Sequence, residues 1–528
     1  MSLFFRVFVT GVALLFLSAC GSGSSGAGNS GGGNSGPYTI GGTVSGLSGT
    51  ELNLLDNGAD KLTIAGNGSF TFKTSIASGG TYTATIDGEP LSPIQFCTVA
   101  HGSGTAVANV TNIQVVCTTP SEKTLYSFGD SPDGSNPQGS LVFDASGNLY
   151  GTTVEGGAYG LGTVFKLTPS QGQWTETILY SFCPHPTNQA SPCPDGAVPY
   201  SGLAFDAEGN LYGTTNYGGA YGSSYVSSVI NEGYSGGTVF ELKPGSNGTW
   251  TESVIHSFGN GTDGMDPAAG VVFDTQGNLY GTTMSGGIAY PGVCYPGCGI
   301  VYELSPGANG QWAETVLHQF CSQTNCNDGG LPFSGLVLDS SGNLYGTAST
   351  GEGLSIGGGT VFELSPNGNG QFTYNTLYQF PGVFQDGDNP RAGVILDSSG
   401  NLYGATENGG TSGNNGTAFE LTKEQGAQWK ENILYEFCEL PLCADGGGPQ
   451  AGLVFDKAGN LYGAAGAVFA LTPGAAGGPW NEVALYTFSG GSDGAGPVAN
   501  LIFDTDGNLY GTSQSEGNKG GAVVEVTP

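Results

Sequence analysis

Hydrophobic residues after position 37 fall in short runs that are separated by clusters of Gly, Asn, Asp and Ser. Four such runs follow one another at 141–143, 149–153, 162–167 and 174–182. Runs of this kind with turn residues between them predict four β-strands. Apolar side chains at adjacent positions, as in Leu141-Val142-Phe143, indicate that both faces of a strand are buried. This is expected when each small sheet lies between two others.

The four-strand pattern repeats along the chain. The pentapeptide Gly-Asn-Leu-Tyr-Gly occurs seven times, beginning at residues 147, 209, 277, 342, 400, 459 and 507. A unit of about sixty residues with four strands is too long for one coil of a β-helix and fits one blade of a β-propeller.

The two ends of the repeat region are complementary. A fourth-strand motif, Leu125-Tyr126-Ser127-Phe128, precedes the first complete unit, and the last unit ends with the third-strand motif Gly521-Ala522-Val523-Val524. The N-terminal segment can therefore supply the missing strand of the last unit, which joins both ends in one sheet and removes its free edges. The sequence predicts an all-β fold, with a closed seven-bladed β-propeller over 122–528.

Residues 38–118 lack the repeat. They alternate short apolar runs with turn signals such as Asp56-Asn57-Gly58, a pattern typical of a small β-sandwich. We expect an N-terminal β-sandwich domain that acts as a spacer.

The first residues have the features of an export signal. A single Arg6 precedes a mostly apolar run that ends in Leu17-Ser18-Ala19-Cys20, too short for a membrane-spanning helix. This ending resembles the bacterial lipobox, which implies a signal peptide over 1–19 and lipidation of Cys20. The alternative is an ordinary signal peptide with a chance cysteine. Residues 20–37 are almost entirely Gly, Ser, Ala and Asn, the composition of a flexible tether.

Ten cysteines are left after Cys20, an even number that suits an oxidising compartment. A zinc site would need a quartet of Cys and His ligands, and only His185 is near any of them in sequence. Local disulfides therefore explain the cysteines better, and we assign no metal site. The expected pairs are Cys97 with Cys117, Cys183 with Cys193, Cys294 with Cys298, Cys321 with Cys326, and Cys438 with Cys443.

The chain carries 43 acidic against 11 basic residues, a net charge of −32. Such a surface repels phosphate backbones and argues against nucleic acid as a partner. It also disfavours binding to anionic lipid headgroups. A lipid anchor is therefore the only membrane contact that we expect.

Two aspartate motifs recur in the repeats. The first, Asp-x-x-Gly-Asn, is a turn in which the carboxylate accepts the amide two residues on; its members are Asp144, Asp206, Asp274, Asp339, Asp397, Asp456 and Asp504. The second, Asp-Gly-x-x-Pro, also suits a turn; its members are Asp133, Asp195, Asp263, Asp328, Asp386, Asp445 and Asp493. The alternative for the first is a calcium ring, for which one carboxylate per turn is too few. For the second it is a ring of acceptors for a cation or a sugar. We expect no cofactor, with calcium as the alternative.

We find no catalytic constellation in the sequence. His256 and His318 replace the tyrosine of the fourth-strand motif, and the chain has no Gly-x-Ser-x-Gly elbow, His-Glu-x-x-His or phosphate loop. A non-catalytic binding module and an extracellular hydrolase or lyase of the lactonase-like propeller kind therefore both stay open, as does a purely structural role in the envelope.

Long irregular loops collect on one predicted face of the ring, where function is usually placed. These loops carry tyrosines that can stack on a sugar or form a protein interface. The alternative is that the rings only pack loop on loop. The candidate ligand-binding residues are Tyr217, Tyr221, Tyr225, Tyr234, Tyr290 and Tyr295.

The repeat resembles the bacterial tandem-repeat family called GloVer, whose members are surface proteins held by varied anchors. We associate its name with the Gly-Leu-Val tripeptides at 335–337 and 452–454, and the seven copies of Phe-Asp or Leu-Asp followed by x-x-Gly-Asn-Leu-Tyr-Gly carry the resemblance. The family implies no reaction. We expect a lipid-anchored monomer at the outer membrane or cell surface that binds a glycan or a protein.

Overall fold

The computed structural model describes residues 36–528 with short gaps. The gaps are 91, 130–131, 185–192, 223–235, 289–293, 351–357, 383–385, 412, 425–427, 475–479, 489, 491–492, 495 and 515–519.

Residues 40–118 form two four-stranded sheets. The first has the order β4 (Gly68–Thr71), β1 (Ile40–Ser45), β8 (Val110–Thr118), β6 (Phe96–Ala100). The second has the order β3 (Asp60–Ile64), β2 (Leu52–Asp56), β5 (Thr81–Gly88), β7 (Ser103–Thr105). Buried side chains of both sheets, among them Ile40, Leu52 and Ile113, share one hydrophobic core.

In the described part of the chain from Ser121 onward, seven four-stranded antiparallel sheets follow one another. The first three are β11 (Val142–Phe143), β12 (Leu149–Thr153), β14 (Thr163–Ser170), β15 (Gln173–Ser181); β16 (Ala204–Phe205), β17 (Leu211–Thr215), β18 (Thr238–Pro244), β19 (Trp250–Ser257); and β20 (Val272–Phe273), β21 (Leu279–Thr283), β22 (Ile300–Pro306), β23 (Trp312–Gln319). The next three are β24 (Val337–Leu338), β25 (Leu344–Ala348), β26 (Thr360–Pro366), β27 (Phe372–Gln379); β29 (Ile395–Leu396), β30 (Leu402–Thr406), β32 (Thr417–Lys423), β33 (Trp429–Glu436); and β34 (Val454–Phe455), β35 (Leu461–Ala464), β36 (Ala467–Thr472), β37 (Asn481–Thr487). The last is β38 (Ile502–Phe503), β39 (Leu509–Ser513), β40 (Ala522–Thr527), β9 (Ser121–Ser127).

The loops of the repeat region, both within and between these sheets, hold small elements. Two short ladders pair β10 (Gly134–Ser135) with β13 (Glu155–Gly156), and β28 (Gly387–Asp388) with β31 (Asn408–Gly409). The 3-10 helices are η1 (Ala308–Gly310), η2 (Thr324–Cys326) and η4 (Pro441–Cys443).

The turn between the first two strands of each sheet is built on the first aspartate motif. Asp144 Oδ1 accepts the backbone N–H of Ser146 at 2.8 Å, and its Oδ2 accepts Asn148 Nδ2 at 2.6 Å and the Tyr150 hydroxyl at 3.0 Å. Partial burial opposes ionisation, but these hydrogen bonds outweigh it and lower the pKa of Asp144. Gly147, three residues after Asp144, has φ +79°, which glycine adopts without strain. The motif thus holds the turn, as the sequence predicts.

The hydrophobic core lies between neighbouring sheets. Tyr150 and Val164 of the first sheet share a cluster of buried side chains with Leu211, Phe240 and Leu242 of the second. Side chains on both faces of a strand are therefore buried, which explains the adjacent apolar residues in each run.

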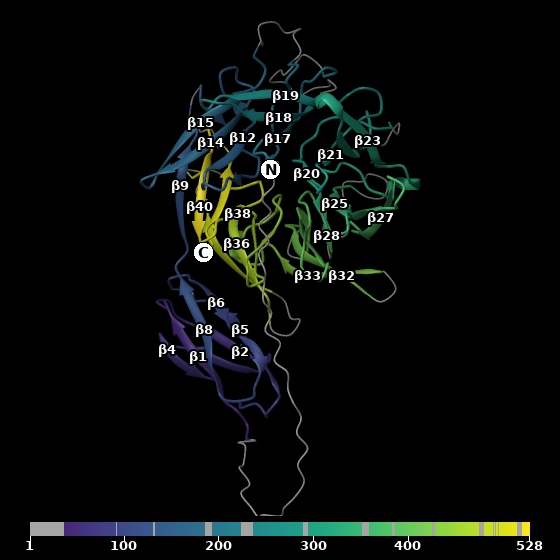
Figure 1. Ribbon diagram of the computed structural model, residues 1–528. Helices are drawn as coiled ribbons and strands as arrows, with labels where there is room; N and C mark the ends of the chain where they lie inside the picture. Colours follow the sequence, from purple (N-terminus) through teal and green to yellow (C-terminus); the bar gives the residue numbers. More distant parts are fainter. Residues whose placement is uncertain are drawn as a thin grey trace, which may run out of the picture.

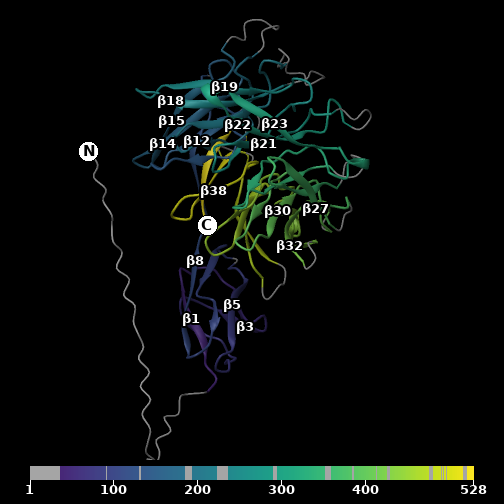
Figure 2. The same ribbon diagram turned by 45° about the vertical axis from the view of Figure 1, so that its right-hand side comes forward.

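The two ends of the repeat region meet in one sheet. β9 pairs antiparallel with β40, and Tyr126 lies opposite Val523. On the next sheet boundary the Thr512 hydroxyl donates to the carbonyl of Gly139 at 3.1 Å. In Figure 1 the yellow C-terminal strands lie beside the blue strands β9 and β12, and in Figure 2 they lie beside β12.

The N-terminal sheets contact the last sheets of the repeat region. Phe96 on β6 packs edge-to-face on Tyr462 of β35, with ring centroids 5.9 Å apart. The Thr118 hydroxyl donates to the carbonyl of Pro528 at 2.6 Å, and Asn481 Nδ2 donates to the carbonyl of Ile86 at 2.9 Å. The two parts therefore share a packed contact, which Figure 1 shows below β36.

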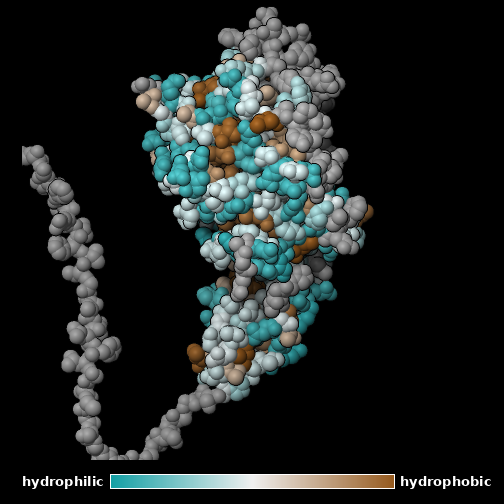
Figure 3. All heavy atoms as spheres, turned by 90° about the vertical axis from the view of Figure 1, so that its right-hand side faces the viewer, coloured by the Kyte–Doolittle hydropathy of each residue, from teal (hydrophilic) through white to brown (hydrophobic). Residues whose placement is uncertain are grey.

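The molecular surface is mostly hydrophilic or neutral in the view of Figure 3, with hydrophobic residues in small separate groups. Among the residues that the structure describes, no helix has the length and apolar character to cross a membrane.

Candidate functional site

One residue from each repeat lines a common cavity of about 360 Å³. Each of these residues directly follows the proline of the Asp-Gly-x-x-Pro motif; they are Gln138, Tyr200, Ala268, Phe333, Arg391, Gln450 and Val498. Asn216, Tyr217 and Met284, from the segments after β17 and β21, complete the lining. The seven repeats therefore converge on one hollow, whose volume falls in the range of small-molecule sites.

The proline fixes where each lining residue lies. Pro199 packs on Gly162 of the preceding sheet so closely that a Cβ on Gly162 would lie 2.5 Å from its Cδ. The neighbouring Ala197 pairs with Tyr217 as an isolated β-bridge, and Asn216 N–H donates to the carbonyl of Val198 at 3.1 Å. The backbone around the cavity is thus held by packing and by hydrogen bonds.

Arg391 is the one cation of the cavity lining. Its Nη1 lies 3.5 Å from Glu407 Oε2, and its guanidinium carbon lies 4.2 Å from the ring centroid of Phe333. Glu407 is held in turn, because it accepts Gln450 Nε2 and Asn389 Nδ2, each at 2.6 Å. A guanidinium has five N–H donors, more than this ion pair occupies, so the arginine can also bind an acceptor in the cavity.

Tyr200 and Tyr217 supply neutral hydroxyl groups. Burial raises the pKa of Tyr200, and Tyr217 and Glu155 add to the effect. Burial also raises the pKa of Tyr217, together with the charge of Asp266. Both groups therefore keep their proton at physiological pH and can donate as well as accept a hydrogen bond.

The tyrosines that the sequence singles out have different locations. Tyr217 lines the cavity, whereas Tyr221 and Tyr295 are 54% and 75% exposed. The other four predicted sites lie outside the described residues: Cys20, Tyr225, Tyr234 and Tyr290. The sequence analysis missed the remaining lining residues. Seven of them could have been found from the repeat, because they occupy the same position in every unit, directly after the motif proline.

The aspartates of the second motif do not line the cavity. Each of the seven carboxylates contacts the tyrosine or histidine of a fourth strand, as Asp195 accepts the Tyr180 hydroxyl at 2.8 Å. A third residue comes from the outer strand of the following sheet, as Glu252 does beside Asp195. We call these groups junction clusters; they are Tyr126–Asp133–Glu176, Tyr180–Asp195–Glu252, His256–Asp263–Glu314, His318–Asp328–Tyr374, Tyr378–Asp386–Glu431, Tyr435–Asp445–Glu482 and Tyr486–Asp493–Glu122. None of these residues lines the cavity.

A larger cavity of about 620 Å³ lies between the N-terminal sheets and the last two sheets of the repeat region, beside Phe96 and Tyr462. Its carboxylates Asp456 and Asp504 are turn aspartates that already hold their own loops. The cavity therefore follows from the contact between the two parts, and we do not take it as the functional site.

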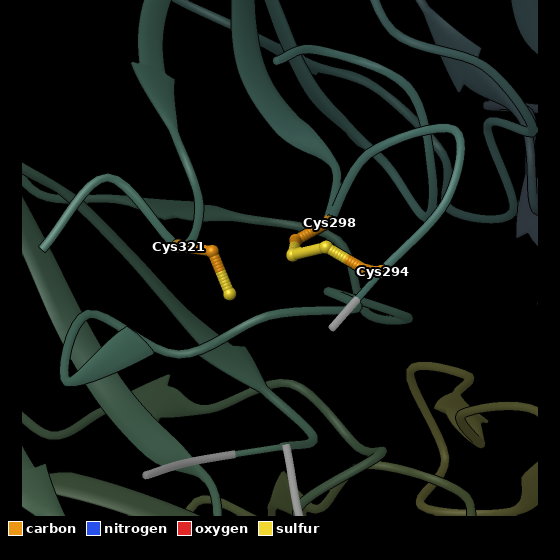
Figure 4. A group of neighbouring side chains, drawn as sticks. All are labelled: Cys294, Cys298 and Cys321. Carbon is orange, nitrogen blue, oxygen red and sulfur yellow. A yellow bond between two sulfur atoms is a disulfide. The ribbon is translucent and has the colours of Figure 1, made fainter. Parts of the chain in front are cut away.

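Cysteine sulfurs gather on the loops of the third sheet. Cys294 and Cys298 are bonded to each other, and Cys321 lies beside them in Figure 4. Cys321 is itself bonded to Cys326. Because all these sulfurs are in disulfides, the group has no thiolate to offer a metal ion. The other bonded pairs are Cys97–Cys117, Cys183–Cys193 and Cys438–Cys443.

Fold and site together define an all-β repeat protein whose four-stranded sheets place one residue each around a shared cavity. The chain belongs to the family of the Gloeobacter/Verrucomicrobia repeat, whose profile matches residues 99–230 and 220–466. The family name thus refers to these bacteria, and our association with Gly-Leu-Val was wrong.

The other comparisons give only distant likenesses. A comparison with curated proteins found no match. A Bacteroides uniformis protein assigned as a 6-phosphogluconolactonase is 14% identical with a TM-score of 0.42 and covers 74% of this chain and 100% of its own. A Thermus thermophilus protein assigned as an oxidoreductase (glucose dehydrogenase) is 14% identical with a TM-score of 0.37 and covers 77% and 100%. An endo-arabinanase from Bacillus licheniformis is 13% identical with a TM-score of 0.28 and covers 63% and 98%. None is close enough to assign a function.

Proposed function

We propose that the chain is an exported, lipid-anchored surface protein whose repeat region is a closed seven-bladed propeller that binds a carbohydrate without catalysis. The observation that carries the proposal is the convergence of one residue per repeat on the central cavity. Concave sites with a few placed polar groups among apolar walls are where small ligands bind.

The contrast between two adjacent positions of the repeat supports a binding role. The motif proline is the same in all seven repeats, whereas the next residue is Gln, Tyr, Ala, Phe, Arg, Gln and Val in turn. A position that only held the ring together would suit the same side chain in every repeat. Here the scaffold is uniform and the lining differs, as expected when each repeat contributes a different group to one ligand.

The lining groups suit a sugar. Gln138, Gln450 and Asn216 carry amides that donate and accept hydrogen bonds, as sugar hydroxyls do. The rings of Tyr200 and Phe333 offer flat apolar faces on which the C–H face of a sugar ring can stack. Arg391 can bind an acidic substituent and is a rare cation in a protein of net charge −32.

The alternative function is a lactonase-like or lyase-like reaction. Two carboxylates lie near lining residues of the cavity. Asp266 is beside Tyr217, and burial raises its pKa to about 6. Glu407 accepts hydrogen bonds from Gln450 and Asn389 and pairs with Arg391. Both carboxylate oxygens of Glu407 are thus already engaged by side chains around the cavity. Glu407 is therefore better suited to orienting the lining than to proton transfer.

A glycan array tests the proposal directly. We expect the labelled full-length mature protein to bind a defined set of glycans, acidic ones among them. Arg391→Gln and Tyr200→Ala should each weaken binding by about tenfold or more, because each removes a charged or stacking contact worth about 1.4 kcal/mol or more. Affinity for the best glycan, measured by titration calorimetry, reports the effect.

The exposed loop tyrosines provide the control. Tyr221→Ala and Tyr295→Ala leave the cavity intact and should change neither affinity nor melting temperature if the cavity is the site. If these variants lose glycan binding while Arg391→Gln binds the glycan fully, the binding site lies on the loops and not in the cavity. Binding of a protein but of no glycan, or turnover of a lactone that depends on Glu407, would overturn the proposal.

The lipid anchor is tested by mass. We expect the protein extracted from membranes to begin at Cys20 with a diacyl or triacyl adduct, because the segment before it matches a lipobox. Cys20→Ser should release the chain in soluble form. An unmodified mature chain in the wild type would refute the anchor.

A further inference from the structure

One of the seven junction clusters combines a histidine with two carboxylates. His256 on β19, Asp263 in the following loop and Glu314 on β23 bring one nitrogen and two carboxylates together, with their ligand atoms all within 4.8 Å of one another. Five other clusters have tyrosine at the position of His256. With histidine in place of tyrosine, the cluster offers an imidazole nitrogen and two carboxylates, which are common ligands of divalent metals.

The distances in this cluster do not suit a direct hydrogen bond. His256 Nε2 lies 3.6 Å from Asp263 Oδ2, whereas the Tyr–Asp contacts at the equivalent position are 2.7 to 3.1 Å. Within the described structure, His256 Nε2 is a buried atom that has no hydrogen-bond partner. Glu314 Oε1 has none either, but it shares this with the glutamates of four tyrosine clusters, so the histidine nitrogen is what sets this cluster apart. Buried polar atoms normally have a partner, so something else is expected to satisfy His256.

A zinc ion meets these requirements. Ligand bonds of 2.0–2.2 Å in a tetrahedron place two ligand atoms about 3.4 Å apart, close to the separation of His256 and Asp263. Two carboxylates and a neutral imidazole also balance the charge of a divalent cation. We propose that His256, Asp263 and Glu314 bind Zn²⁺, which clamps the second sheet of the repeat region to the third.

The next cluster is an internal control. His318 also replaces a tyrosine, but its Nε2 lies 3.1 Å from Asp328 Oδ2, within hydrogen-bonding range. Its third position holds Tyr374 instead of a glutamate, and that ring stacks on His318 at 3.7 Å. This cluster offers only two ligands and has already satisfied its histidine. A histidine at the junction is therefore not sufficient, and the glutamate completes the site.

Metal content and zinc titration of the full chain test the proposal. After EDTA treatment and dialysis, we expect one Zn²⁺ to bind per chain with micromolar or better affinity, and the melting temperature to rise by several degrees. Mg²⁺ at the same concentration should have little effect, because it prefers oxygen ligands. His256→Tyr should lower zinc affinity at least tenfold. It introduces the residue that five of the other clusters have, so folding is expected to persist. Glu314→Gln should do the same.

His318→Tyr is the matched control and should leave zinc binding unchanged. Equal binding by the wild type and His256→Tyr would overturn the proposal, as would the absence of zinc-dependent stabilisation in the wild type. If the wild type binds more than one Zn²⁺ per chain and His256→Tyr binds one fewer, the result supports this site and shows that others exist.

Discussion

Leu125→Asp is expected to remove the cooperative thermal transition of the repeat region or to lower its melting temperature by about 10 °C or more. Leu125 on β9 is buried in a core shared with Leu149, Tyr510 and Val523, residues that come from the two ends of the repeat region. A charge placed in such a core without a partner costs about 4 kcal/mol or more. The effect is large because β9 is the outer strand of the sheet that joins both ends, and losing it exposes the edge of β40.

Ser127→Ala on the same strand is the matched control, since Ser127 is exposed and should tolerate the change. A cysteine pair at Lys123 and Glu525 tests the closure independently. These residues are direct partners in the ladder of β9 and β40, so an oxidised disulfide should join positions that are four hundred residues apart in sequence. A Leu125→Asp protein that melts like the wild type, or cysteines that do not bond, would contradict the closed ring.

The repeats made much of the fold predictable. Strands, turns and buried faces follow from local patterns, and the turn aspartates make the hydrogen bonds that their spacing implies. The pairing of β9 with β40 could also be predicted, because the order of strand motifs at the two ends is complementary.

The candidate site was predictable only in part. Tyr217 was singled out because it lies in a long loop, and this signal also selected Tyr221 and Tyr295, which are exposed. Arg391 was missed, because nothing in its local sequence says that the residue after a motif proline lines a cavity shared with the other repeats. A column of the repeat alignment contains this information, but its meaning depends on how seven sheets are arranged around one hollow.

The sequence did not predict the junction clusters, for a related reason. Glu176 lies in the sequence Gln-Trp-Thr-Glu-Thr, which reads as an exposed polar face of an outer strand. Its partner Asp133 lies in the loop that joins the last sheet to the first. Burial, with the charge of Asp133 and a hydrogen bond to it, raises the pKa of Glu176 to about 8. A contact between sheets has no local sequence signature, so the unusual protonation of these glutamates could not be predicted.

The junction glutamates should make the protein lose stability as pH rises. Burial, with the nearby aspartates, raises the pKa of Glu176, Glu252 and Glu482 to about 8 and that of Glu431 to about 9. Between pH 4.5 and these values the folded chain holds protons that the unfolded chain has released. The free energy of unfolding therefore falls as pH rises through this range. Stability should be greatest near pH 5, because four turn aspartates with lowered pKa values lose their contribution in stronger acid; they are Asp144, Asp274, Asp339 and Asp504.

We expect the melting temperature to fall by about 5 °C or more between pH 6 and pH 9, where four groups lose a stabilising proton, each discounted to about 1 kcal/mol for solvent screening. The quadruple variant Glu176→Gln, Glu252→Gln, Glu431→Gln, Glu482→Gln keeps the neutral form at all pH values and should flatten the profile. General repulsion among surface carboxylates would also destabilise the protein at high pH, but salt screens it, and it changes little above pH 6 because those groups are already ionised. A steep profile that persists in the quadruple variant at high salt would show that the junction glutamates are ionised at neutral pH. A profile that is flat in the variant and steep in the wild type shows that protonated carboxyl groups hold neighbouring sheets together.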